Sequence, residues 1–209
     1  MRFLLVLVGL LWGAAAPLVA QGDPKLDVAV PQNGAVQEGT SVTVANLLAN
    51  SKTRELLRNG FTTGIHFRLE LWREGRYVND LSDRSDWDVF VVYDPTAKLY
   101  NVVRRMGNVH ENFGGFETIT SAEAQFDGPF RVPLHPTRSG RYYYNLVVDV
   151  LSLSESDLDA SLQWLRGSSG PVKGNPITAL RSGLGTFLSR VLGGGKQEFQ
   201  HQSGRFVVP

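Results

Sequence analysis

The chain has 209 residues, with 21 Lys and Arg side chains against 20 Asp and Glu, and it contains no cysteine. A balanced charge without a basic stripe argues against a nucleic-acid-binding protein. The lack of Cys excludes disulfides, thiol catalysis and Cys-based zinc sites, but a chain of this length can bury enough apolar surface to fold without them.

The first twenty residues predict a secretory signal peptide. Met1-Arg2 is a positively charged start, residues 3–11 are almost entirely apolar, and Leu18-Val19-Ala20 ends the segment like a cleavage site. We therefore expect a mature protein that is periplasmic or secreted, in a bacterial envelope, because small secreted eukaryotic domains commonly use disulfides. The alternative is a leader retained as an inner-membrane anchor, because its apolar length is close to the shortest bilayer-spanning helix.

Residues 21–167 predict one β-rich domain. Apolar and mixed positions alternate over residues 65–72, which is the period of a half-buried strand. Asp94-Pro95 is a turn signal that follows a second strand. The strands that we expect are 25–30, 41–44, 65–72, 87–93, 99–103, 130–134 and 141–151, and Pro133 favours an edge position for the sixth of these.

Short helices are predicted to interrupt these strands. The expected helices are 51–58, ended by Asn59-Gly60, then 120–126 and 154–166. The fold class that follows is mainly β (α+β), either an antiparallel β-sandwich or a strongly curved sheet, with short helices packed on it.

The residues after 167 change in composition. Residues 168–176 predict a linker, and residues from about 177 predict an amphipathic helix. Phe206-Val207-Val208 is a possible terminal strand. We expect the apolar stripe of the helix to bind an envelope protein, the membrane surface or the chain's own sheet, and deletion of residues 171–209 to distinguish these cases. The stripe comprises Leu180, Leu184, Phe187, Leu188, Val191 and Leu192, the first five of which are the predicted partner-binding residues.

An acid-rich stretch over residues 80–88 is the sharpest local feature. Asp80, Asp83 and Asp86 could offer oxygen ligands to calcium, but their spacing matches no calcium loop and Arg84 lies among them. We interpret the stretch as a solvated hairpin loop that discourages edge pairing. No metal site is predicted, because the four histidines, His66, His110, His135 and His201, have no ligand-like spacing.

No motif predicts catalysis or a cofactor. The sequence has no Gly-x-Ser-x-Gly elbow, and Gly167-Ser168-Ser169-Gly170 lies in linker sequence. Distant carboxylate pairs remain open. His110-Glu111 beside Gly114-Gly115 could line a pocket, although the glycine pair favours a chain reversal. We therefore predict a protein that is not an enzyme.

Aromatic residues gather in the expected strands. Trp72, Trp87 and Tyr142 to Tyr144 could form a platform for a sugar, lipid or peptide, in which Trp72, Trp87, Tyr142 and Tyr144 would bind the ligand. The more common role of such residues is cross-strand packing beneath helices. Our first functional hypothesis is an envelope interaction module of unknown partner, and the alternative is a periplasmic ligand-binding module that uses this aromatic face.

Three stretches resemble a known family. Residues 56–61, 65–73 and 87–94 are similar to the bacterial envelope family filed as domain of unknown function 4390, with the Leu57-Arg58-Asn59-Gly60 helix end before a long strand as the best marker. The resemblance covers about residues 25–166 and implies a secreted, non-enzymatic β domain, sometimes encoded near envelope sensor kinases. It carries no catalytic or binding residues, and the chain departs from the family after about Gly167.

Overall fold

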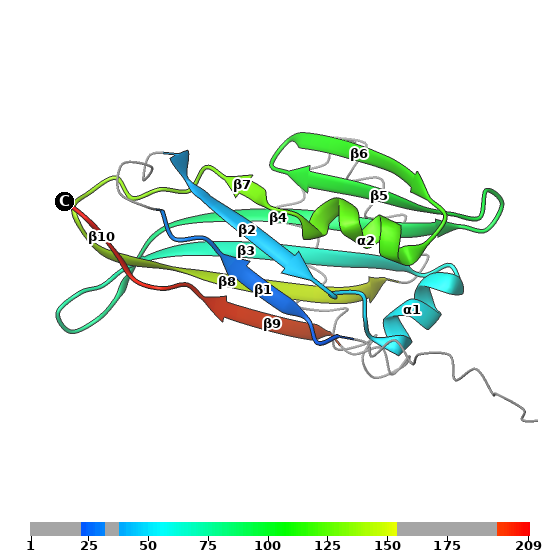
Figure 1. Ribbon diagram of the computed structural model, residues 1–209, viewed down its shortest axis with the longest axis horizontal. Coiled ribbons are helices and arrows are strands. Elements are labelled where there is room, and N and C mark those ends of the chain that lie inside the picture. The colour runs from blue at the N-terminus through cyan, green and yellow to red at the C-terminus, as the bar shows by residue number, and fades with distance from the viewer. Residues whose placement is uncertain (1–21, 32–37, 154–195) are drawn as a thin grey trace, which may run out of the picture.

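The computed structural model describes residues 22–31, 38–153 and 196–209. In these ranges ten strands form two antiparallel sheets, and two short helices accompany them (Figure 1). None of the described helices is long and apolar enough to cross a membrane. The mainly β, α+β fold class that the sequence predicts is confirmed.

The larger sheet is built around β3, which pairs along its length with β4 on one side and β8 on the other. The strand order is β10-β8-β3-β4-β5-β6, and β9 also pairs with β8. β9 and β10 follow one another along the same edge of β8. The bounds are β3 Thr62–Arg73, β4 Asp80–Asp94, β5 Leu99–Met106, β6 Val109–Phe116, β8 Gly140–Leu153, β9 Gln197–Gln202 and β10 Phe206–Val208.

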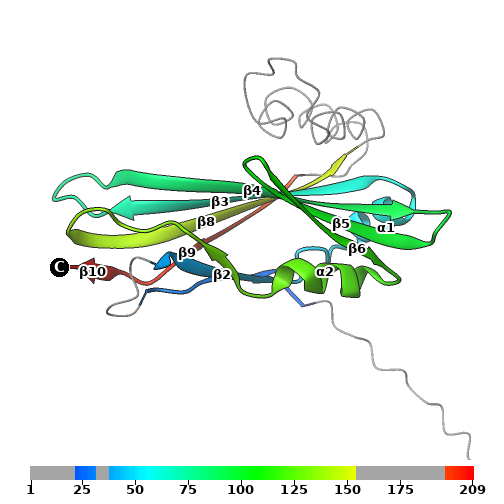
Figure 2. The same cartoon turned by 90° about the horizontal axis from the view of Figure 1, so that it is seen from above.

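The smaller sheet has the order β1-β2-β7. Its strands are β1 (Lys25–Val28), β2 (Thr40–Ala45) and β7 (Phe130–Val132). As predicted, the strand that ends just before Pro133 lies at a sheet edge. At an edge, the missing N–H group of a proline costs no hydrogen bond between strands. Figure 2 shows this sheet, together with α2 (Ile119–Asp127), on one face of the larger sheet.

The hydrophobic core lies between these two layers. Alternation along β3 turns Ile65, Phe67, Leu69 and Leu71 toward the smaller sheet, where all four are buried. The Trp87 ring of β4 stacks on Phe67 with the ring centroids 5.0 Å apart. The apolar face predicted for residues 65–72 therefore lines one side of the hydrophobic core.

Local capping fixes the limits of α1 (Ser51–Arg58). The Asn50 side chain accepts hydrogen bonds from the backbone nitrogens of Lys52 and Thr53, at 2.9 and 3.3 Å. Gly60 has a φ of 87°, the left-handed conformation that the Asn59-Gly60 pair predicts after a helix end. The helix and its end are confirmed.

Three segments differ from the sequence predictions. Residues 80–86 are the first half of β4 and not a loop, because their backbone pairs with β3 and the turn lies at residues 74–79. Gly114-Gly115, which suggested a chain reversal, lies within strand β6. Gly114 has a φ of 93° and lies at a bulge, where the pairing with β5 shifts between Val102 and Val103. β9 was not predicted. Four expected segments lie outside the described residues: the leader (1–20), the helix 154–166, the linker 168–176 and the helix that begins at about residue 177. The description resumes at residue 196.

Candidate functional site

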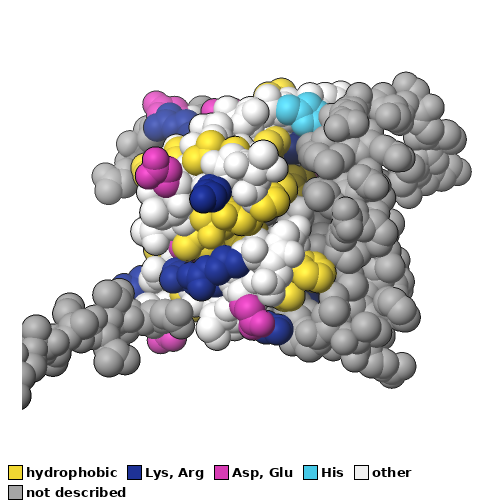
Figure 3. All heavy atoms as spheres, turned by 90° about the vertical axis from the view of Figure 1, so that its right-hand side faces the viewer, with side chains coloured by type: hydrophobic (Ala, Val, Ile, Leu, Met, Phe, Trp, Pro, Cys, Tyr) yellow, Lys and Arg dark blue, Asp and Glu magenta, His cyan; other side chains and the backbone are white. Residues whose placement is uncertain are grey.

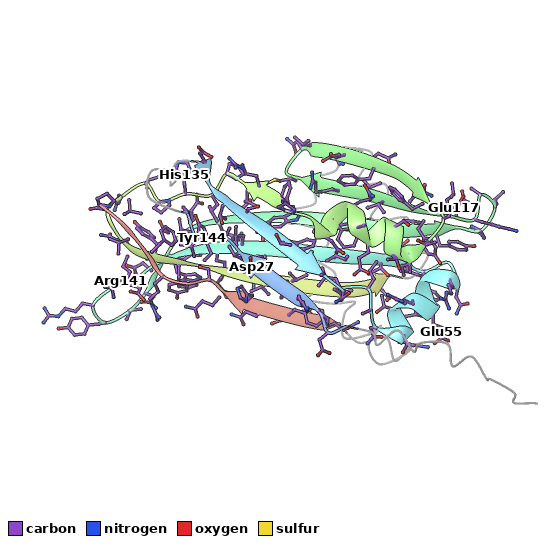
Figure 4. The ribbon with its side chains drawn as sticks, viewed as in Figure 1. Asp27, Glu55, Glu117, His135, Arg141 and Tyr144 are labelled. Atoms are coloured by element: carbon purple, nitrogen blue, oxygen red, sulfur yellow. The ribbon has the colours of Figure 1, made fainter. Side chains whose placement is uncertain are left out.

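The hairpin between β3 and β4 projects from one end of the molecule (Figures 1 and 4). Its base is fixed to β8, because the backbone nitrogen of Glu74 donates to the Arg141 carbonyl oxygen at 2.8 Å. Its turn needs glycine at position 75, where a Cβ atom would lie 2.0 Å from the Val78 carbonyl oxygen. The hairpin is therefore an ordered projection with a defined apex.

The apex carries apolar side chains that contact little else. Tyr77 is 87% exposed and Val78 is 74% exposed. Five large apolar side chains of the described residues are exposed, and four of them lie at this end. These four are Tyr77, Val78, Leu81 on β4 and Val207 on β10. Single exposed apolar residues are ordinary, whereas such a group at one end indicates a contact surface.

Arginines surround the base of the same hairpin. The Nε atoms of Arg141 and Arg205 both contact the Glu74 carboxylate, the first at 3.5 Å. One carboxylate cannot neutralise two guanidinium groups, so the cluster keeps a positive charge. The Arg76 guanidinium lies 5.5 Å from the centroid of the Tyr77 ring, which is a cation–π contact.

The charge at this end is basic in a chain whose overall charge is balanced. Its acidic side chains are Glu74 and Asp80, and its basic ones are Arg73, Arg76, Arg138, Arg141 and Arg205. Arg73 donates to the Ser139 carbonyl oxygen at 3.1 Å, and it forms no ion pair with a carboxylate of the described ranges. We call these arginines, together with Tyr77, Val78, Leu81 and Val207, the basic apolar end.

The opposite end of the molecule is different. Figure 3 shows a band of hydrophobic side chains there, with Lys and Arg side chains beside it. Tyr93 and Tyr100 belong to this region of β4 and β5, and their ring centroids lie 4.8 Å apart. Tyr100 is buried and Tyr93 half-buried. Neither ring is therefore exposed in the way that the Tyr77 ring is.

The aromatic platform predicted from the sequence does not form. Trp87, Tyr142 and Tyr144 are buried in the core, where no ligand reaches them. The Tyr144 hydroxyl donates to the Leu134 carbonyl oxygen at 2.9 Å, and burial raises the pKa of that hydroxyl. Trp72 lies on the opposite face of the sheet and donates through Nε1 to Glu70 at 2.9 Å. Strand alternation divides the four residues between two faces.

A row of ionisable side chains crosses the outer face of the larger sheet. Asp149, His66, Asp88 and Arg105 are consecutive neighbours on β8, β3, β4 and β5, and the first three are buried. His66 Nδ1 lies 2.8 Å from Asp88 Oδ1, and His66 Nε2 lies 3.5 Å from Asp86 Oδ1. This contact row was not predicted, although polar residues alternate along both strands.

The charged side chains of this row pair with one another and with their neighbours on the same face. Burial disfavours the charged imidazole of His66, but the hydrogen bonds and charges of Asp86 and Asp88 outweigh burial and raise its pKa to about 9. A histidine that stays protonated at neutral pH cannot serve as a general base. Lys196 similarly contacts Asp149 at 2.9 Å and links β9 to β8. The geometry favours a structural role.

The acidic residues of β4 do not converge on one point. Asp83 and Asp86 are an odd number of positions apart on a strand, so their side chains leave opposite faces. Asp86 contacts Arg84 at 2.9 Å as well as His66. In the described ranges no group of three His, Asp or Glu side chains could hold a metal ion.

The remaining histidine-containing stretches have separate surroundings. His110 and Glu111 lie on β6, where the Glu111 carboxylate contacts Arg104. His201 of β9 lies 4.0 Å from Asp27 of β1. Strands β1, β2 and β9 line a groove of about 600 Å³. Its lining residues are Pro24, Lys25, Leu26, Asp27, Thr43, Val44, Ala45, Gln200 and His201.

The predicted partner-binding residues Leu180, Leu184, Phe187, Leu188 and Val191 lie outside the described residues. The chain matches no protein-family model, no curated protein and no solved structure at a significant level. The resemblance to the envelope family therefore stays a prediction, and the case for function rests on the geometry above.

Proposed function

We propose that this protein is an exported, non-enzymatic interaction module of the bacterial envelope, which contacts its partner through the basic apolar end. The observation that carries the proposal is the apex of the β3–β4 hairpin, where Tyr77 and Val78 are exposed beside two arginines that share one carboxylate. Tyr and Arg are the side chains that dominate binding surfaces, because they combine apolar area with directed hydrogen bonds.

The rest of the molecule fits a supporting role for this end. The two layers, which we interpret as a β-sandwich, give β3 and β4 a rigid base, and the turn at Gly75 is set by close backbone packing. The ion pairs of His66 and Lys196 join neighbouring strands. The leader-like residues 1–20 support export, with the mature chain starting at about Gln21.

A photo-crosslinking experiment tests the proposal. Benzoylphenylalanine would replace Tyr77 in the exported protein, and irradiation of intact cells should yield a discrete adduct with a protein or with a lipid. Val109, which is 70% exposed at the turn between β5 and β6, provides the matched control position. The proposal fails if position 77 gives no adduct, or if position 109 gives the same adducts.

The groove between β1 and β9 favours a second candidate function, the binding of a small ligand or a short peptide. Its volume of about 600 Å³ and its mixture of apolar walls with Asp27 and His201 suit such a ligand. A saturable rise in melting temperature with a pool of short peptides, lost in His201→Ala, would support it. Equal curves for both proteins would exclude the groove as the binding site.

A further inference from the structure

The partner of the basic apolar end follows from its shape and charge, on the basis of the proposed function. We propose that this end docks on an anionic membrane surface, with Tyr77 and Val78 in the interfacial layer and the arginines on lipid phosphates. A membrane surface is preferred to a protein because the apex is a convex projection (Figures 1 and 2). A convex apex offers little area to a rigid partner, whereas lipids can close around it.

The side chains at the apex are those that a bilayer interface accepts. Tyr is enriched at the headgroup level, because its ring is apolar and its hydroxyl is polar. Val78, next to Tyr77, adds apolar area and is 74% exposed. Arg76, which stacks on the Tyr77 ring, can extend its guanidinium to the phosphates while its aliphatic stem stays with the ring.

The arginines at the base supply the electrostatic part. Arg141 and Arg205 are exposed and contact Glu74 through Nε. Because the two guanidinium groups share the single carboxylate of Glu74, the pair keeps a positive charge that can bind phosphate oxygens. Arg138 is exposed on the adjoining turn. Attraction of this kind requires anionic lipid and weakens as salt screens it.

Vesicle flotation tests the proposal on the exported protein. The probes are vesicles of phosphatidylcholine alone and vesicles that also contain phosphatidylglycerol, at about 30 mol %. We expect flotation with the anionic vesicles only, and less of it in high salt. The double variant Tyr77→Ser with Val78→Ser should weaken binding about tenfold, because it removes the apolar contact. Arg76→Gln should also weaken it.

The control variant is Val109→Ser, which removes an equally exposed apolar side chain at another turn. It should float like the unaltered protein, and all variants should melt at the same temperature because the substituted side chains are exposed. Equal binding to both kinds of vesicle, no binding to either, or an equal loss in Val109→Ser would overturn the membrane proposal. A protein adduct at position 77 without vesicle binding would overturn it but leave the interaction module intact, whereas the absence of both would refute both proposals.

Discussion

Asp127 lies half-buried at the end of α2, and its Oδ1 atom has no hydrogen-bond partner in the part of the chain that the structure describes. Burial, and then the negative charge of Glu123, raise the pKa of the Asp127 carboxyl from 3.8 to about 7. Because the pKa is higher in the folded protein, the folded state binds the proton more tightly than the unfolded state. The contribution of Asp127 to stability is therefore lost as the pH rises from about 4 to about 7.

Asp127→Asn should remove this loss, because the amide does not ionise. We expect the variant to melt at a higher temperature than the unaltered protein at pH 8, with a smaller difference at pH 5.5. Asp80→Asn, which changes an exposed carboxyl, is the matched control. Thermal melts by circular dichroism at the two pH values measure the effect, and equal shifts in both variants would contradict it.

His66 also makes a contribution to stability that falls as the pH rises, but in a higher pH range. Its pKa of about 9 lies above the usual histidine value of 6.5, so its contribution to stability is complete below about pH 6.5 and disappears as the pH rises through 9. His66→Gln removes the 2.8 Å partner of Asp88 and one of the cations beside Asp86, which keeps Arg84, and we expect this to cost about 3 kcal/mol at pH 7. Urea unfolding at pH 6, 7.5 and 9.5 measures this cost.

The difference between His66→Gln and the unaltered protein should shrink at pH 9.5, and a constant difference would show that the imidazole charge is not involved. His110→Gln on β6 is the control. The His66 contacts could not be predicted from sequence, because they depend on the register that places Asp88 directly opposite it. The alternation of polar and apolar residues indicates which side chains share a face of a strand, but it does not indicate which strands pair.

At the scale of single elements, the N-cap of α1 offers a direct test. Asn50→Ala removes the acceptor for two backbone N–H groups and should lower the free energy of unfolding by about 1 kcal/mol. Asn59→Ala at the other end of the helix is the matched control, because the φ of Asn59 is −84° and suits alanine. Urea unfolding should separate the two variants, and equal losses would disprove the role of the cap.

Elements with local signals were predictable from sequence, and elements stabilised by distant partners were not. The limits of α1 follow from Asn50 and Gly60, and the turn after β4 follows from Asp94, whose Oδ1 accepts from the Thr96 nitrogen at 2.8 Å. β9 has one apolar residue, Phe199, and becomes a strand only because the edge of β8 pairs with it. The acidic start of β4 has the composition of a loop, but its pairing with β3 decides its conformation.

The whole molecule depends on residues that the sequence suggested to be an appendage. Residues 197–202 and 206–208 complete the edge of β8, and the Phe206 ring lies 5.3 Å from that of Tyr144. The sequence boundary at residue 167 therefore does not separate the terminal segment from the β domain. No local pattern could reveal this, because the pairing joins residues far apart in the chain.

Phe206→Ala should lower the free energy of unfolding by about 3 kcal/mol, because it opens a cavity beside two core tyrosines. Val207→Ser, which changes the exposed neighbour, should have almost no effect. Urea unfolding of both variants measures the contrast, and a small loss for Phe206→Ala would show that the terminal strand is not part of the core. Deletion of residues 171–209 would remove both terminal strands, so it cannot by itself report on a partner.

The position of β3 between β4 and β8 also governs how quickly the protein reaches this structure. β4 follows β3 directly, but β8 comes much later in the chain, and Phe67 must find Val148 across all the intervening strands. Closing so long a loop before its contacts stabilise it makes folding slow. During that interval one edge of the central strand is unpaired, and it is then most exposed to pairing with other chains.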